Sequence, residues 1–280
     1  MDYKKKNKRI RAFILFVVAV CLIPIGQAYD ASVQHKTQME ELRESGRRQE
    51  EDSEMDKTKP QGEEATQRPG EAELQNAMEP EKTEQETPAI LEKYAAFYEK
   101  NSDMIGWLSI EGMVIDYPVM QCEDDEYYLH HDFYGNEDKY GCLYVRAKAD
   151  VNTPGTNFII YGHNMKDGSM FGDLDLYRDE SFYLEHSRIS FDTLYEERTY
   201  EIVAVFLSQV YNSDEDVFKY YQFYQADTQE EFDYFYKNIK KLSLYDTGVS
   251  AEFGDTFLTL STCAYHVEDG RFVVVARKIE

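Results

Sequence analysis

The stretch FLTLSTCAYHVEDGRFVVVARK, residues 257–278, decides the fold because it has the pattern of two β-strands joined by a short loop. Side chains alternate along a strand, so one face of the first strand carries Phe257, Thr259, Ser261 and Cys263. A Glu-Asp-Gly turn signal follows at 268–270, and Arg271 begins the second strand. In an antiparallel hairpin, the last residue of one strand and the first of the next lie at the same end of the sheet. We therefore expect the Cys263 thiol and the Arg271 guanidinium to face one small volume.

Further short strands are indicated after residue 101, with Gly, Asn and Asp between them. The expected strands are 107–110, 114–119, 141–146, 157–161, 199–208, 256–262 and 271–278. Many short strands separated by turn residues favour a β-barrel or a β-sandwich. The chain is therefore expected to be mainly β.

Two helices are expected beside these strands. The first has Thr87 as its cap and Pro88 at its first position, and one face carries Leu91, Tyr94, Ala95 and Tyr98. The second begins with a capping box at 228–231, and its apolar stripe is Phe232, Phe235, Tyr236, Ile239 and Leu242. We expect both stripes to contact the core rather than a ligand.

The amino terminus has the pattern of a membrane anchor. Lysines and arginines crowd residues 4–11, directly before the apolar run 12–28, and this bias keeps an amino terminus in the cytoplasm. As a helix the run is about 25 Å long, at the short end for a bilayer span. A cleaved signal peptide is the alternative, because Gly26-Gln27-Ala28 resembles a cleavage site. We expect an uncleaved anchor within residues 1–29, with the rest of the chain outside the cytoplasm.

Residues 30–87 are rich in Glu, Gln, Lys and Thr and have few aromatic or β-branched residues. A segment of this composition cannot bury enough apolar surface to offset its chain entropy. We expect an acidic, disordered stalk with transient helix around residues 39–55. A single globular domain is expected to follow over residues 88–280.

The composition limits the classes of function. The formal charge is -24, with 54 acidic against 30 basic residues, so attraction to nucleic acid phosphates is disfavoured. The chain has four cysteines, too few for a fold that depends on disulfides, and Cys21 lies in the apolar run. Cys122 and Cys142 either form a bridge or are two small buried side chains. No spacing typical of metal ligands is present, so neither a metal nor a cofactor is expected.

A catalytic thiol needs a base beside it, because a free thiol with a pKa of about 8.5 is mostly protonated at neutral pH. Two of the six histidines are candidates. His163 follows the apolar strand NFIIY and a glycine, at a strand exit where functional groups often lie. His266 lies shortly after Cys263 in the expected loop. Periodicity does not decide between these two histidines.

Three blocks of the sequence resemble the catalytic blocks of sortases, the cysteine transpeptidases of Gram-positive cell surfaces. They are NFIIYGHNMKDGSMFGDL around His163, TLSTC ending at Cys263, and GRFVVVA around Arg271. The stretch YYLHHDFYGNEDKYGCLYV, residues 127–145, and the long helix before the last strands are similar to class B in particular. The resemblance covers nearly all of residues 88–280. It implies a closed β-barrel of about eight strands, with an amino-terminal helix and a long helix between the late strands.

The resemblance also implies a chemistry. Cys263 is then the nucleophile, His163 the acid and base, and Arg271 the group that stabilises the oxyanion or the substrate. Ser261 and Thr262, beside the nucleophile, are expected to bind substrate. The implied partners are a sorting-signal peptide of the NPxTN kind, cleaved after its threonine, and an amine of the cell wall or of a pilin. Arg146 stands where the family is expected to have an acid, so details of the substrate groove are expected to differ.

Two other functions remain open at this stage. A secreted cysteine peptidase would use the same residues with water as the acceptor. A non-catalytic surface-binding module would need none of the three residues for chemistry.

Overall fold

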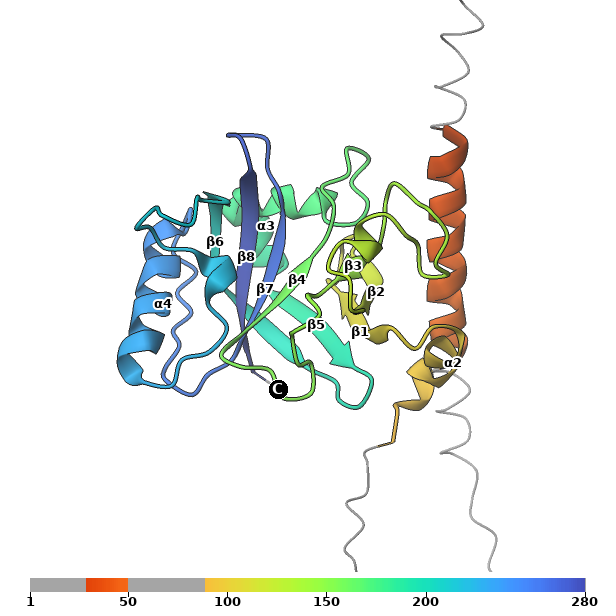
Figure 1. Cartoon of the computed structure of the whole chain (residues 1–280), viewed down its shortest axis with the longest axis horizontal. Helices are drawn as coiled ribbons and strands as arrows, with labels where there is room; N and C mark the ends of the chain where they lie inside the picture. The colour runs from red at the N-terminus through yellow and green to blue at the C-terminus, as the bar shows by residue number, and fades with distance from the viewer. Residues whose placement is uncertain (1–28, 50–88, 280) are drawn as a thin grey trace, which may run out of the picture.

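The computed structural model describes residues 29–49 and 89–279. Within these ranges, eight strands close into a barrel in the order β1-β2-β3-β4-β7-β8-β6-β5 (Figure 1). The strands are β1 (Met104–Ser109), β2 (Asp116–Met120), β3 (Leu143–Tyr144), β4 (Asn157–Tyr161), β5 (Arg188–Thr193), β6 (Thr199–Gln209), β7 (Phe257–Cys263) and β8 (Gly270–Lys278). The closed β-barrel that the resemblance implied is confirmed.

After the helix at 29–49, the described helices precede β1 or lie between strands along the chain. They are α2 (Glu92–Lys100), η1 (Tyr127–Leu129), η2 (Gly172–Arg178), α3 (Glu180–Glu185), η3 (Tyr220–Gln222) and α4 (Gln229–Leu242). The helix α4 lies between β6 and β7 along the chain, as expected for the long late helix. Its predicted capping box is present, because the Thr228 side chain accepts from the backbone of Glu231 and the Glu231 side chain accepts from the backbone of Thr228.

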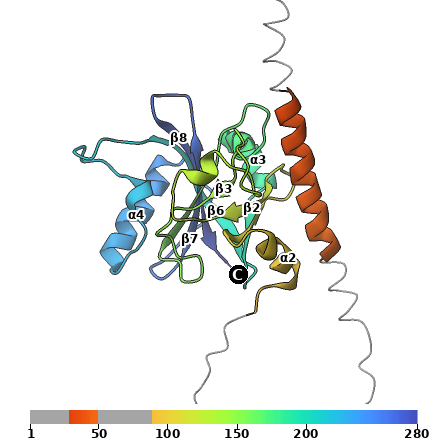
Figure 2. The same cartoon turned by 45° about the vertical axis from the view of Figure 1, so that its right-hand side comes forward.

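The central strands are buried on both faces, and this explains the near-continuous apolar run of β8. Inside the barrel lie Leu258, Leu260, Phe272 and Val274. On the outside, Phe257, Val273 and Val275 pack with Phe232, Phe235 and Ile239 of α4. Strands covered on both faces lose the simple alternation of polar and apolar residues. The helix α4 lies beside the barrel (Figure 2), and its apolar side chains form a second core with the outer face of β7 and β8.

The strand β5 is absent from the strands expected from the sequence. Its side chains alternate, with Ile189, Phe191 and Thr193 turned inward and the residues between them more exposed. One of the three inward side chains is the polar Thr193. Only two apolar residues therefore mark the inward face, which is a weak signal for a strand. Pairing with β1 and β6 supplies the stability that the local sequence lacks.

The first helix of the domain begins later than predicted. The residue before α2 is Leu91, whose side chain offers no cap to the helix. The expected cap and first residue, Thr87 and Pro88, lie outside the described residues. The buried side chains of α2 are Tyr94 and Phe97. Phe97 was not in the predicted stripe, and it is buried because it packs against aromatic rings of the barrel and of the loop after η1.

Residues 29–49 form a helix beside the barrel, where the sequence predicted a disordered stalk (Figure 1). Met39 and Leu42 are only 4% and 1% exposed on this helix, and His35 is 2% exposed. These positions share one helical face, so a narrow stripe is buried although the average composition is polar. The prediction of disorder is wrong for this part of the stalk. The remainder, from residue 50, lies outside the described residues.

The expected membrane anchor is not part of the described structure. Within residues 29–49 and 89–279, no helix combines the length and apolar character needed to cross a membrane. The apolar run at 12–28 lies outside these ranges. The anchor therefore stays a prediction from the sequence.

Replacing Phe235 by alanine is expected to destabilise the domain by about 3–5 kcal/mol, because a large side chain is removed from a closed core. Phe235 is fully buried and stacks on Phe223 with ring centroids 4.3 Å apart. Urea unfolding followed by circular dichroism measures the change. Lys237→Ala, on the exposed face of the same helix, is the control and should unfold near the wild-type midpoint. A loss below about 1 kcal/mol for Phe235→Ala would contradict a core shared by α4 and the barrel.

Candidate active site

The hairpin of β7 and β8 places Cys263 opposite Arg271. The two residues are direct partners in the antiparallel register, so their side chains leave the sheet on the same face. The loop between the strands closes at Gly270, where a Cβ atom would lie 2.1 Å from the carbonyl oxygen of Ala264. Only glycine permits this close approach. The hairpin predicted from the sequence is therefore confirmed.

The strand β4 brings His163 to the same end of the sheet. It pairs in parallel with β7, and its last residue, Tyr161, is the partner of Ser261. Continuing this register by two residues places His163 beside Cys263. The next residue, Asn164, fixes the arrangement because its side-chain amide donates a 2.7 Å hydrogen bond to the carbonyl oxygen of Cys263. Sequence analysis did not identify Asn164 as part of the site.

The imidazole of His163 is oriented by a backbone carbonyl. Its Nε2 atom lies 2.8 Å from the carbonyl oxygen of Leu129, at the end of η1. A carbonyl oxygen only accepts, so Nε2 carries the hydrogen, and Nδ1 is the nitrogen that remains for proton exchange. The rival base, His266, lies on the exposed loop between β7 and β8. The parallel register and the Asn164 contact favour His163 over His266.

Arg271 is half-buried and is held by its own turn. Its Nη1 atom donates to the carbonyl oxygens of Asp269 at 3.1 Å and of Gly270 at 2.9 Å. A guanidinium has five N–H groups in a fixed plane, so these bonds fix its direction while other N–H groups remain for a ligand. Asp269 has a positive φ of 51°, a conformation that asparagine and aspartate adopt more readily than most residues.

Two tyrosines next to this site were not identified from the sequence. Burial raises the pKa of Tyr144 to about 12, and the nearby groups of Cys263 and Arg271 have smaller, opposed effects on it. Burial also raises the pKa of Tyr220 to about 12, against the lowering effect of its hydrogen bond with Ser261. Both phenols are therefore neutral at physiological pH. The chain has 23 tyrosines, and no local pattern distinguishes these two.

Ser261 and Thr262 do not have the exposure expected of substrate-binding residues. They are 1% and 2% exposed. The hydroxyl of Ser261 lies 2.7 Å from the hydroxyl of Tyr220, and that of Thr262 donates to the carbonyl oxygen of Gly162 at 2.7 Å. Both hydroxyls thus have partners within the protein. The two hydroxyls join β7 to η3 and to the end of β4, and contact with substrate stays a prediction from the sequence.

A cavity of about 690 Å³ lies along β4, and none of the three predicted catalytic residues lines it. Tyr161 lines this cavity. It is the register partner of Ser261, which lies two residues before Cys263 on β7. The guanidinium of Arg146 lies over the Tyr161 ring, 5.4 Å from its centroid, and donates at 3.5 Å to the hydroxyl of Tyr224. The position where an acid was expected therefore presents a cation to this cavity.

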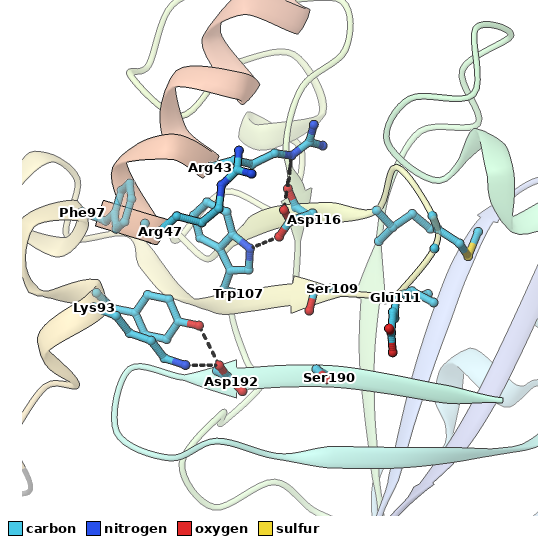
Figure 3. A pocket seen from close by; sticks show the side chains of 16 residues that line it. Arg43, Arg47, Lys93, Phe97, Trp107, Ser109, Glu111, Asp116, Ser190 and Asp192 are labelled. Carbon is cyan, nitrogen blue, oxygen red and sulfur yellow. Dashed lines mark hydrogen bonds and ion pairs between the residues drawn. The ribbon is translucent and has the colours of Figure 1, made fainter. Parts of the chain in front are cut away.

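A second cavity, of about 450 Å³, lies between the helix at 29–49, α2 and β1 (Figure 3). None of the three predicted catalytic residues lines it. Two of its three acidic side chains have partners within the protein, because Asp116 accepts from the Trp107 ring at 2.6 Å and Asp192 accepts from Lys93 at 2.9 Å. We therefore assign the chemistry to the end of β4, β7 and β8 and not to this cavity.

A family model, the Sortase domain, matches residues 108–279, a range that contains His163, Cys263 and Arg271. The chain belongs to the sortase family. It is 36% identical over 185 residues to Sortase B of Listeria monocytogenes, a match that covers 64% of this chain and 71% of the relative. This likeness confirms the resemblance to class B, and the sortase described here is a cysteine transpeptidase.

Solved structures of class B sortases share the fold. Sortase B from Bacillus anthracis matches with a TM-score of 0.60 and 31% identity, covering 68% of this chain and 86% of that chain. A Staphylococcus aureus sortase B–substrate complex matches with a TM-score of 0.61 and 26% identity, covering 69% and 87%. The likeness therefore extends over most of each solved domain.

The other two cysteines of the described domain are free thiols, so the alternative of a Cys122–Cys142 bridge is not realised. Cys142 is buried, and burial raises the pKa of its thiol well above the usual range. Burial also raises the pKa of Cys122, which is only partly buried. Both side chains are therefore predominantly in the unreactive thiol form at neutral pH.

Iodoacetamide at pH 7 is expected to modify Cys263 in the folded sortase and to leave Cys142 unmodified. Labelling of Cys122 should increase as the pH is raised, because burial raises the pKa of its thiol and keeps it protonated at neutral pH. Peptide mapping by mass identifies each site. Cys263→Ala, which should take up no label at pH 7 within residues 89–279, is the control. Fast labelling of Cys142 in the native protein would contradict its burial.

Proposed function

We propose that this sortase is held in the membrane by residues 12–28, with its amino terminus inside and its catalytic domain on the extracellular face. Its substrate is a sorting signal of the NPxTN kind on a secreted surface protein, cleaved after the threonine. The acceptor is an amine of a peptidoglycan cross-bridge or a pilin lysine. The observation that carries the proposal is the pairing of Cys263 with Arg271 at the sheet end where His163 leaves β4.

In the first half of the reaction, the Cys263 thiolate attacks the carbonyl carbon of the threonine and a C–S bond forms. The carbonyl oxygen becomes an oxyanion, which the N–H groups of Arg271 stabilise together with a backbone N–H. As the intermediate collapses, the C–N bond breaks. His163, protonated, gives its proton to the departing amine, which leaves neutral.

In the second half, the thioacyl enzyme is resolved by an amine. The amine nitrogen attacks the thioester carbon, and His163, now neutral, accepts a proton from it. The C–S bond breaks, the Cys263 thiolate returns, and a new amide bond is formed. The overall reaction exchanges one amide for another. The membrane anchor serves this chemistry because both the exported protein and the wall acceptor lie outside the cell.

Cys263→Ala is expected to abolish turnover of an NPQTN peptide, because no other group in the site can form the thioester. Arg271→Ala should lower kcat/KM by about 100-fold, the usual effect of losing one oxyanion donor. His163→Ala should reduce turnover far more than His266→Ala. Steady-state kinetics with a quenched fluorescent peptide measure the turnover of all four variants. If only His266→Ala inactivates the enzyme, the assignment of the base is wrong.

The acceptor class is tested by the products. With an added amine such as triglycine, the expected product is the peptide joined through its threonine to that amine. Without an amine, slow hydrolysis and an accumulated acyl enzyme on Cys263 are expected, and both are detected by mass. Equal amounts of the hydrolysed peptide with and without the amine would identify a cysteine peptidase instead.

A further inference from the structure

His163 is held between two loops that meet at its imidazole. The first is loop 130–141, which starts at the Leu129 carbonyl that binds Nε2. This loop closes on the same carbonyl, since a Cβ at Gly141 would lie 2.8 Å from the Leu129 oxygen. The second is loop 163–172, which folds back so that the Phe171 N–H donates to the His163 carbonyl at 2.9 Å. A movement of either loop therefore moves the imidazole.

The helix at 29–49 binds the first of these loops. His35 Nδ1 lies 3.0 Å from a carboxylate oxygen of Asp138, and its ring stacks on Tyr140 with centroids 4.2 Å apart. One turn further along, the Gln38 side-chain amide donates to Asp132 at 2.9 Å. Asp138, Tyr140 and Asp132, the residues that the helix contacts here, all belong to loop 130–141.

The same helix also binds the second loop, through Asp167. The Asp167 carboxylate accepts from the Ser32 hydroxyl at 3.3 Å and lies 3.9 Å from the Lys36 ammonium. It also accepts from the Tyr140 hydroxyl at 3.3 Å. Tyr140, on which His35 stacks, therefore connects the two loops. The residues of the helix reach both supports of His163 without touching it.

The contacts of the helix with the two loops are polar and discrete, whereas Met39 and Leu42 of the same helix join the apolar core cluster. His35 is 2% exposed, and its Nε2 atom has no partner among the described residues. Burial of an imidazole nitrogen without a partner is unfavourable, and the contact of Nδ1 with Asp138 offsets part of this free energy. Toward its other end, the helix is separated from α2 and β1 by the 450 Å³ cavity of Figure 3. The polar contacts near residues 32–38 thus carry the coupling to the loops.

We propose that the helix at 29–49 is a positioning element of the active site, and that His35 is the residue through which it orients the His163 imidazole. The inference rests on the role given to His163 under the proposed function. The helix lies outside the matched family range of 108–279, so that match does not account for it. His35 acts through Asp138 and Tyr140 and does not contact the reacting atoms.

The test uses the full chain in detergent micelles with the quenched NPQTN peptide and triglycine. His35→Ala is expected to lower kcat about tenfold with KM within twofold, because a displacement of about 1 Å in a catalytic group can cost up to about 100-fold. His35→Asn retains a donor for Asp138 and should recover most of kcat. His35→Phe retains the stacking alone and should not. Arg48→Ala, on the exposed face of the same helix, is the matched control and should behave as wild type.

A second readout follows the imidazole itself. With ¹³C-labelled histidine, the Cε1–H resonance of residue 163, assigned from its loss in His163→Ala, should shift in His35→Ala and not in Arg48→Ala. Thermal unfolding shows whether the barrel stays folded in each variant. If His35→Ala does not fold, Gln38→Ala, which removes only the Asp132 bond, takes its place with the same expected direction.

Three results would overturn the proposal: kcat within twofold of wild type in the folded variant, an equal loss in Arg48→Ala, or a loss of kcat with the residue 163 resonance unmoved. A failure of the proposed function has a different signature. In that case His163→Ala would retain turnover, while the resonance shift would still report whether His35 orients residue 163.

Discussion

The parallel pairing of β4 with β7 is the constraint on which the active site depends. A slip of one residue between these two strands would take Cys263 out of register with His163, although its pairing with Arg271 belongs to the β7–β8 hairpin. Buried polar groups specify the register, since the Thr259 hydroxyl donates at 2.6 Å to the side chain of Asn157, and both residues are almost fully buried. Such a pair tolerates no slip, because each group would then be buried without a partner. Stability of the barrel and geometry of the site are therefore set by the same contacts.

The protein combines a rigid strand scaffold with a histidine held by loops. Cys263 and Arg271 lie on paired strands, whereas the imidazole of His163 depends on the Leu129 carbonyl and on the two loops around it. Loops are the more mobile supports, so the polar contacts from the helix at 29–49 have a clear mechanical use. Under our proposal, the helix at 29–49 therefore does more than separate the domain from the proposed anchor.

Strong local patterns made part of this structure predictable. The β7–β8 hairpin and the capping box of α4 follow from residues close in sequence, and the structure has both. The strand β5 was missed because its inward face includes Thr193, and its stability comes from pairing with β1 and β6. The helix at 29–49 was missed because a narrow buried face is hidden by an acidic average composition. Tertiary contacts decide such elements, and a single sequence does not display them.

In the active site too, residues in local motifs were predictable and residues whose roles depend on tertiary contacts were not. Cys263, His163 and Arg271 were identified from motifs, and the register places them together. Asn164, Tyr144 and Tyr220 were missed because their roles arise only from spatial neighbours. Ser261 and Thr262 lie in the motif, but the burial of β7 on both faces gives their hydroxyls internal partners. The motif therefore predicted where the two residues lie in the fold, and it did not predict the internal partners of their hydroxyls.

The most direct test of the central claim is disulfide trapping between residues 163 and 263. In His163→Cys the two sulfurs should join under mild oxidation, because cysteines on neighbouring strand ends fall within the Cα separation of about 4.4–6.8 Å that a disulfide needs. Peptide mapping by mass, with and without reductant, identifies the linked pair. A 163–263 disulfide formed in the folded protein is the predicted result. Free thiols at both positions, or a link from residue 163 to Cys122 or Cys142 instead, would contradict the convergence of β4 and β7 at one catalytic site.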